Sequence, residues 1–149
     1  MKIGIGNDHV ALEYKLRLKE YIEEKYDIEV IDYGTSSTKR FDYPISAQRV
    51  SQAVINHEVD RGILICGTGV GMGIAANKYP GIRCVTCSEP YSAKLSREHN
   101  NSNVLSFGSR VVGIEVAKMI IDEWIQAEYE GGRHQKRLDM LESHNLSKL

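Results

Sequence analysis

Short apolar runs alternate with longer amphipathic stretches along this chain of 149 residues, and this alternation constrains the fold more than any other feature. The apolar runs have the length of buried strands, and the stretches between them have the length or spacing of helices. Strands that alternate with helices predict an α/β fold, with a five-stranded parallel sheet covered on both faces. The predicted strands are residues 2–6, 29–32, 62–66, 82–86 and 104–107, and the predicted helices are residues 11–25, 45–57, 70–78, 92–99 and 113–127.

The length of the chain favours one domain over residues 1–149, because a single core at this size buries roughly 70% of the unfolded surface. The segment 128–149 begins with a glycine pair and then places Leu138 and Leu141 at helical spacing. This pattern predicts an appended C-terminal helix. A terminal helix that does not fold back commonly packs on a second subunit, so we expect a homo-oligomer.

Composition excludes several classes of partner. A formal net charge of -1 provides no field that would attract nucleic acid or an anionic membrane. No apolar run approaches the roughly 18 residues of a membrane span, and the N-terminus lacks the apolar region of a signal peptide. Three cysteines make an odd count, so we expect reduced thiols and a cytoplasmic protein.

Polar residues follow several of the predicted strands at the point where each strand ends. Ligands of open parallel sheets bind beyond the carboxyl ends of the strands, where loops and helix N-termini meet. We therefore expect a site at this edge. The residues that follow the strands are Asn7, Asp8 and His9; Cys66 with the glycines behind it; Cys87, Ser88 and Glu89; and Gly108, Ser109 and Arg110.

The loop after Cys66 places glycine at positions 67, 69, 71 and 73. It matches neither a Walker loop nor a dinucleotide fingerprint, because the required lysine, hydroxyl and third glycine are missing. Glycines let backbone N–H groups face an anion or an oxyanion, and the following helix adds its positive end. This field should favour the thiolate of Cys66, with the Thr68 hydroxyl beside it, so Cys66 is a candidate base. The alternative is a small buried residue that ends a strand.

The remaining candidates are weaker when taken singly. Cys84 and Cys87 begin inside a predicted strand, where extended geometry holds them too far apart for a disulfide, so we expect both to pack in the core. Asp8, His9 and His99 are predicted near the same sheet edge as Cys66. A metal site from Cys66 and the two histidines is possible, but no local ligand spacing supports it. Arg133 and Arg137 are four residues apart, which allows two interpretations. They bind one phosphate between them, or they belong to a basic helix that faces solvent.

Five separated motifs together resemble the ribose-5-phosphate isomerase B family, which also includes allose-6-phosphate isomerases and galactose-6-phosphate isomerase subunits. They cover nearly the whole chain and are GNDH at 6–9, DYP at 42–44, ICGTGVGMGIAANK at 65–78, SEPYSAKLSREHNNSNVLSFGSR at 88–110 and EGGRHQKR at 130–137. The resemblance implies an aldose–ketose isomerase of a phosphorylated sugar, with a Rossmann-like three-layer fold and no metal or cofactor. It also implies a homodimer with active sites at the subunit interface, and such dimers could pair further.

The resemblance assigns roles that spacing alone does not supply. Cys66 looks like the base that moves a proton between C2 and C1, and His99 looks like the acid that assists ring opening. Asp8 would hold sugar hydroxyls or the ring oxygen, and Tyr43 in the DYP motif is a possible substrate contact. The enediolate would be stabilised by Thr68, Asn100 and the amides of Gly67, Gly69, Val70 and Gly71, and the phosphate would be bound by His9, Arg110, Arg133 and Arg137.

Three alternatives remain open from the sequence. An isomerase of allose 6-phosphate or galactose 6-phosphate would use the same thiol, loop and arginines. A nucleotide-binding regulatory domain would also present a glycine loop at a strand end, but it would not need Cys66. A thiol hydrolase using Cys66 and His99 would leave the arginine pair unexplained.

Overall fold

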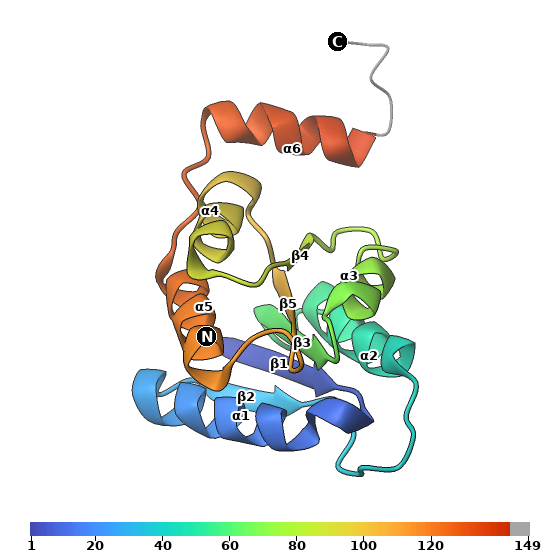
Figure 1. The fold of residues 1–149 in the computed structure, drawn as a ribbon. Helices are drawn as coiled ribbons and strands as arrows, with labels where there is room; N and C mark the ends of the chain where they lie inside the picture. Colours follow the sequence, from blue (N-terminus) through green and yellow to red (C-terminus); the bar gives the residue numbers. More distant parts are fainter. Residues whose placement is uncertain (144–149) are drawn as a thin grey trace.

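The computed structural model describes residues 1–143, and it confirms the predicted α/β class (Figure 1). Five strands form one sheet in the order β2-β1-β3-β5-β4, and every neighbouring pair is parallel. All five strands lie within or close to the predicted ranges. They are β1 (Lys2–Asn7), β2 (Glu29–Asp32), β3 (Arg61–Cys66), β4 (Cys84–Thr86) and β5 (Val104–Gly108).

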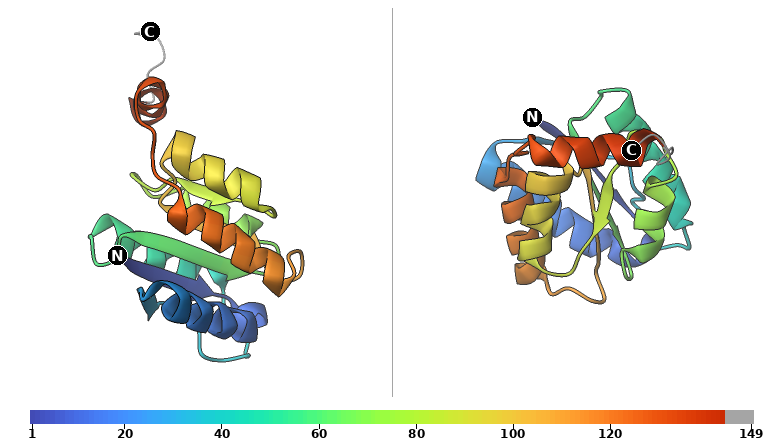
Figure 2. Two further views of the ribbon diagram at one scale, coloured as in Figure 1. Left: turned by 90° about the vertical axis from the view of Figure 1, so that its left-hand side faces the viewer. Right: turned by 90° about the horizontal axis from the view of Figure 1, so that it is seen from above.

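Helices cover both faces of the sheet, which makes three layers (Figure 2). Successive residues of a strand point to opposite faces, and β3 shows this directly. Ile63 and Ile65 belong to the larger core cluster, whereas Leu64 and Cys66 belong to the smaller one on the other face. The larger core is covered by α1 (Leu12–Tyr26), α4 (Pro90–Asn100) and α5 (Ile114–Gln126), and the smaller by α2 (Tyr43–Ile55) and α3 (Val70–Ala76).

Two helices begin earlier than predicted because their first turns are capped or contain proline. The Glu89 carboxylate accepts the N–H of Ser92 at 3.0 Å, and Pro90 occupies the first turn of α4. Proline fits there because the first turn leaves its N–H groups without helical partners. Pro44 likewise stands in the first turn of α2, which therefore starts at Tyr43.

The fourth strand is shorter than predicted. Gly81 has a φ of 84°, and the N–H of Ile82 bonds to the carbonyl of Tyr79, so a turn occupies the predicted start of the strand. The N–H of Arg83 donates to the Asn103 side chain at 2.8 Å. The chain therefore pairs with β5 only from Cys84 onward.

The C-terminal helix α6 (Arg133–Ser143) lies on the outside of α4 (Figure 1). Gly131 and Gly132 precede it with φ values of 63° and 54°, a conformation that glycine adopts without strain. Leu138 is buried against the domain, whereas Leu141 is 61% exposed. The face of α6 that carries Leu138 therefore packs on the same chain. Residues 144–149 of the predicted extension lie outside the described residues.

Two further expectations concern the cysteines and membranes. All three cysteines carry free thiols, and Cys84 and Cys87 pack against different core clusters, on opposite faces of the sheet. The predicted packing role of this pair is confirmed.

Within residues 1–143, no helix has both the length and the apolar character that crossing a membrane requires.

Candidate functional site

Cys66 lies at the carboxyl end of β3, where the glycine loop begins. Its side chain is almost fully buried, and its Sγ accepts the N–H of Gly69 at 3.1 Å. Gly69 has a φ of 79° and caps α3, and a Cβ at this position would lie 2.7 Å from the backbone of Phe107. Only glycine fits there, and the turn that Gly69 makes points its own N–H at the sulfur of Cys66.

Backbone hydrogen bonds join this loop to the loop after β5. The carbonyl of Cys66 accepts the N–H of Ser109 at 2.8 Å, and the carbonyl of Gly67 accepts the N–H of Arg110 at 3.1 Å. The two loops touch so closely that a Cβ on Gly108 would lie 2.5 Å from the Cα of Thr68. The exposed Arg110 side chain lies over Gly67, so a cation stands beside the thiol loop.

Asp8 and His9 follow β1 at the same edge. The N–H of Asp8 donates to the carbonyl of Ile65 at 3.2 Å, and its carboxylate accepts the N–H of Val10, which caps the short helix η1 (His9–Ala11). The half-buried His9 ring places Nδ1 3.3 Å from both the N–H and the carbonyl of Phe41. The structure therefore brings both predicted residues next to the glycine loop.

Tyr43 also belongs to this edge. Its ring packs on the start of α3, where a Cβ on Gly71 would lie 2.8 Å from Cζ of the tyrosine. Thr68 is exposed, and its hydroxyl accepts the N–H of Val70 at 3.4 Å. We call these residues the carboxyl-edge group: Asp8, His9, Tyr43, Cys66, Gly67, Thr68, Gly69, Val70, Gly71 and Arg110.

Asn7 supports this group; the sequence placed it at this edge of the sheet but gave it no catalytic or binding role. It is fully buried, its amide donates to the carbonyl of Asp8 at 2.8 Å, and its Oδ1 accepts the N–H of Thr35. Its own carbonyl accepts the Ser46 hydroxyl at 2.8 Å. An amide at the end of an otherwise apolar strand was the available signal, because buried polar groups need partners.

His99 and Asn100 do not lie at this edge, and the prediction that placed His99 beside Cys66 was wrong. The carbonyl of Asn100 accepts Nε of Arg83 at 3.1 Å, and Arg83 directly precedes β4. The last turn of α4 is thus at the amino ends of the strands. The physical reason is the direction of the crossover, since a helix that joins two parallel strands must return to the start of the next strand.

Arg133 and Arg137 lie on α6, which packs against α4 next to His99. Both arginines are exposed, and Arg133 lies 3.5 Å from the carboxylate of Glu130. The His99 ring stacks on the ring of His134, with centroids 4.3 Å apart. The remaining predicted residues therefore form a second set, the helical group: His99, Asn100, Arg133 and Arg137.

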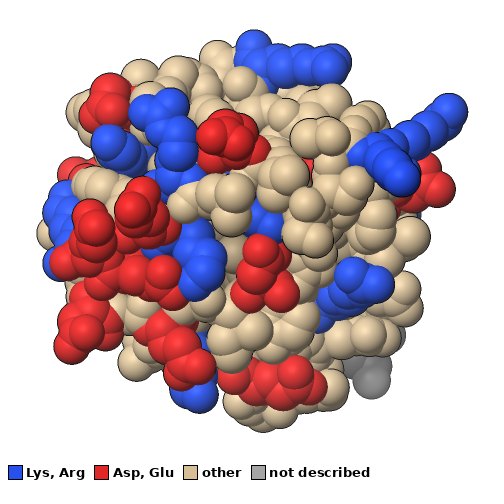
Figure 3. All heavy atoms as spheres, turned by 90° about the horizontal axis from the view of Figure 1, so that it is seen from below, with Lys and Arg blue, Asp and Glu red and all other residues tan. Residues whose placement is uncertain are grey.

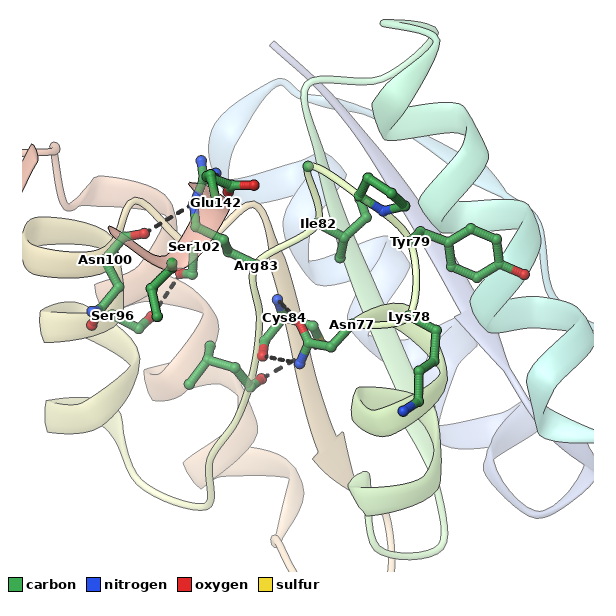
Figure 4. A pocket seen from close by; sticks show the side chains of 14 residues that line it. Asn77, Lys78, Tyr79, Ile82, Arg83, Cys84, Ser96, Asn100, Ser102 and Glu142 are labelled. Carbon is green, nitrogen blue, oxygen red and sulfur yellow. Dashed lines mark hydrogen bonds and ion pairs between the residues drawn. The ribbon is translucent and has the colours of Figure 1, made fainter. Parts of the chain in front are cut away.

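A hollow of about 810 Å³ also lies at the amino end of the sheet (Figure 4). It is formed by the turn before β4, by α4 and by the end of α6, and it is lined by Arg83, Asn100, Leu141 and Glu142 among others. Cys66 does not line it. A smaller hollow of about 340 Å³ continues between α3 and β4, past Val70 and Ile74.

Electrostatics distinguish the three thiols. Burial raises the pKa of Cys84 and of Cys87 to about 12, so neither is a thiolate near neutral pH. Among the described residues 1–143, only Cys66 has a backbone N–H that donates to its sulfur. Acidic and basic side chains lie side by side on the face of the molecule shown in Figure 3.

A thiol, an amide-rich loop and an arginine at the carboxyl edge of a parallel sheet form the kind of site at which α/β proteins bind small molecules. A profile of the Ribose/Galactose Isomerase family matches residues 3–141, so the chain belongs to that family. This confirms the resemblance that the five motifs indicated. It also disfavours the nucleotide-binding and thiol-hydrolase alternatives.

Individual relatives are similar to this chain over nearly its whole length. Ribose-5-phosphate isomerase B of Escherichia coli is 59% identical over 140 residues, which cover 94% of this chain and 93% of that protein. The structure of Clostridium thermocellum ribose-5-phosphate isomerase B superposes with a TM-score of 0.94 at 45% identity and covers 100% of both chains. The Mycoplasma genitalium enzyme, solved with bound ribulose 5-phosphate, gives 0.90 at 39% identity and covers 96% of this chain and 95% of that one.

Proposed function

We propose that the protein interconverts ribose 5-phosphate and ribulose 5-phosphate, with Cys66 as the base. The observation that carries this proposal is the Gly69 N–H aimed at the Cys66 sulfur from 3.1 Å, within a loop that also presents further amides and the Thr68 hydroxyl. Three of the relatives named above are ribose-5-phosphate isomerases. Their names support a pentose phosphate as the substrate.

In the proposed reaction the Cys66 thiolate removes the proton from C2 of the open-chain aldose. The electron pair of that bond forms the C1–C2 double bond of an enediolate, while the aldehyde oxygen takes up negative charge. The loop amides and Thr68 stabilise this charge, which exists only along the reaction path and therefore lowers the barrier. The thiol then returns the proton to C1, and the hydroxyl proton of O2 moves to O1 to give the ketose.

The active site is proposed to form between two copies of the chain. His99, Asn100 and the arginines of α6 lie at the other end of β5 from Cys66, whereas a proton donor must come within hydrogen-bond reach of the sugar. The 5 residues of β5 alone rise by roughly 13 Å, which no side-chain rotation spans. A partner subunit can bring its helical group to the carboxyl-edge group.

The surface proposed for this homodimer is the open edge of the sheet on β4. The two hollows adjoin there, and three apolar side chains on α3 and α6 are left in water, with Val70 52%, Ile74 58% and Leu141 61% exposed. Apolar side chains gathered around hollows on an unpaired strand edge are typical of a subunit interface. In this arrangement Asp8 holds sugar hydroxyls, His9 and Arg110 bind the phosphate with the partner's arginines, and Tyr43 contacts the substrate. We expect this assembly in the cytoplasm, where thiols stay reduced.

The test is interconversion of the two pentose phosphates by wild type, Cys66→Ala and Cys84→Ala in the presence of a chelator. We expect kcat of Cys66→Ala to fall by at least about 100-fold, because proton transfer loses its base. Binding of a phosphate-bearing competitor should change little, since arginines hold the anion. Cys84→Ala is the matched control, because its buried thiol should not react. Equal activity of wild type and Cys66→Ala would refute the thiol base.

The substrate panel should include allose 6-phosphate and galactose 6-phosphate. The family that matches this chain is described by both ribose and galactose, so a six-carbon substrate is the second candidate. Turnover of a hexose phosphate with no turnover of the pentose would replace the substrate proposed here and keep the catalytic roles.

A further inference from the structure

Two histidines and a carboxylate gather where α4 and α6 meet. The rings of His99 and His134 stack with their centroids 4.3 Å apart and their planes inclined by 10°. The carboxylate of Glu130 lies 3.2 Å from Nε2 of His134. One nitrogen from each ring and one carboxylate oxygen all lie within 4.8 Å of one another.

The His134 ring has an unmet hydrogen-bonding atom. The residue is 5% exposed, and within residues 1–143 its Nε2 has no hydrogen-bond partner, because the nearby Glu130 oxygen lies off the direction of such a bond. Leaving a buried polar nitrogen without a partner costs free energy. A ligand that accepts an electron pair from this nitrogen would remove that cost.

The residue types of this cluster also suit a transition metal. Neutral imidazole is the commonest protein ligand of transition metals, and two histidines with one carboxylate leave an open position on a tetrahedral ion.

We propose that His99, Glu130 and His134 bind one divalent transition-metal ion, such as Zn²⁺, and that the bound metal inhibits the protein. Ligand atoms around one Zn²⁺ lie about 3.3 Å apart, so rotation of the rings from their stacked position brings the three groups into range. The metal would withhold His99 from the substrate and tie α6 to α4. The inhibition, but not the binding, rests on the proposed isomerase function.

Arg133 opposes the metal, because its guanidinium lies 3.5 Å from the Glu130 carboxylate. The ion must displace this cation from the carboxylate. We therefore expect Arg133→Gln to bind the metal more tightly than wild type, by about tenfold or less.

The first experiment is a calorimetric titration of metal-free full-length protein with Zn²⁺, repeated with Co²⁺ to read tetrahedral coordination from its visible absorption. We expect one ion per chain. His134→Phe keeps a ring to stack on His99, and Glu130→Gln changes an exposed side chain, so both variants should fold. Each should bind at least about tenfold more weakly, since the loss of even an outer-shell partner has that effect.

Two controls separate this site from others. His57 is exposed and has a φ of 58°, which asparagine tolerates, so His57→Asn removes a histidine elsewhere without strain. Cys66→Ala tests whether the thiol is a ligand. Both should bind the metal as wild type does.

The activity assay then tests inhibition. Zn²⁺ should inhibit wild type reversibly, whereas His134→Phe should keep its basal activity and lose sensitivity to the metal. Binding of Zn²⁺ weaker than about 0.1 mM, or undiminished binding by both ligand variants, would overturn the site. Tight binding without inhibition of an active isomerase would overturn the inhibitory role. If the protein turns over no sugar phosphate, the isomerase proposal fails, and the Zn²⁺ titration alone decides whether the metal site exists.

Discussion

Mixing two inactive variants should restore activity if each active site draws on two chains. Cys66→Ala damages the carboxyl-edge group, and His99→Asn damages the helical group at the other end of β5. In a dimer formed from one chain of each variant, one site carries both defects and the other carries neither. Free exchange of equal amounts gives about half mixed dimers, each with one working site of two. The expected activity is therefore about a quarter of the wild-type value.

The assay follows isomerisation after the two variants are unfolded and refolded together, with differently tagged chains to count the mixed dimers. The matched control pairs Cys66→Ala with Asp8→Asn. Both substitutions lie in the carboxyl-edge group, so every site of a mixed dimer contains a defect and no activity should return. Activity that stays at the level of the separate variants, with mixed dimers demonstrated, would refute the shared site.

Two further predictions concern the loop contact and acid stability. Gly108→Ala places a Cβ 2.5 Å from the Cα of Thr68 and should lower both the urea midpoint and kcat, whereas Gly113→Ala, with nothing within 4 Å, should change neither. Although partial burial raises the pKa of the Asp122 carboxyl, hydrogen bonds from Lys25 and two tyrosine hydroxyls lower it below its ordinary value. This stabilisation is complete at neutral pH and is lost as the pH falls through the lowered pKa, so the Tm difference between wild type and Asp122→Asn should shrink towards about pH 3. A Tm difference that stays constant or increases as the pH is lowered would contradict a lowered pKa of Asp122.

The fold could be predicted because burial imposes its pattern directly on the sequence. The continuous apolar runs gave five strands in the correct places, and the stretches between them gave the helices. The missed boundaries depend on local side-chain bonds. The cap of Glu89 on Ser92 and the bond from Arg83 to Asn103 each need a specific partner that periodicity does not reveal.

The positions of the predicted site residues could be inferred from the sequence only in part. Cys66, Asp8 and Arg110 converge because strand ends share an edge, which follows from topology alone. His99 was misplaced although the same topology sends its helix back to the opposite edge. The stacking of His99 on His134 could not be foreseen, because it depends on the turn at Gly131 and Gly132 that directs α6 onto α4.

The bonds between the loops after β3 and β5 have a consequence for substrate length. The N–H of Ser109 bonds to the carbonyl of Cys66 and the N–H of Arg110 to that of Gly67, so the distance between the Cα atoms of Cys66 and Arg110 is set by the backbone and not by the choice of side chains nearby. A six-carbon sugar phosphate is longer by one bond of about 1.5 Å. If the active site forms between two chains as proposed, discrimination between pentose and hexose phosphates should therefore change with substitutions on the second chain's α4 and α6. Substitutions within the two joined loops should alter turnover of both sugars alike.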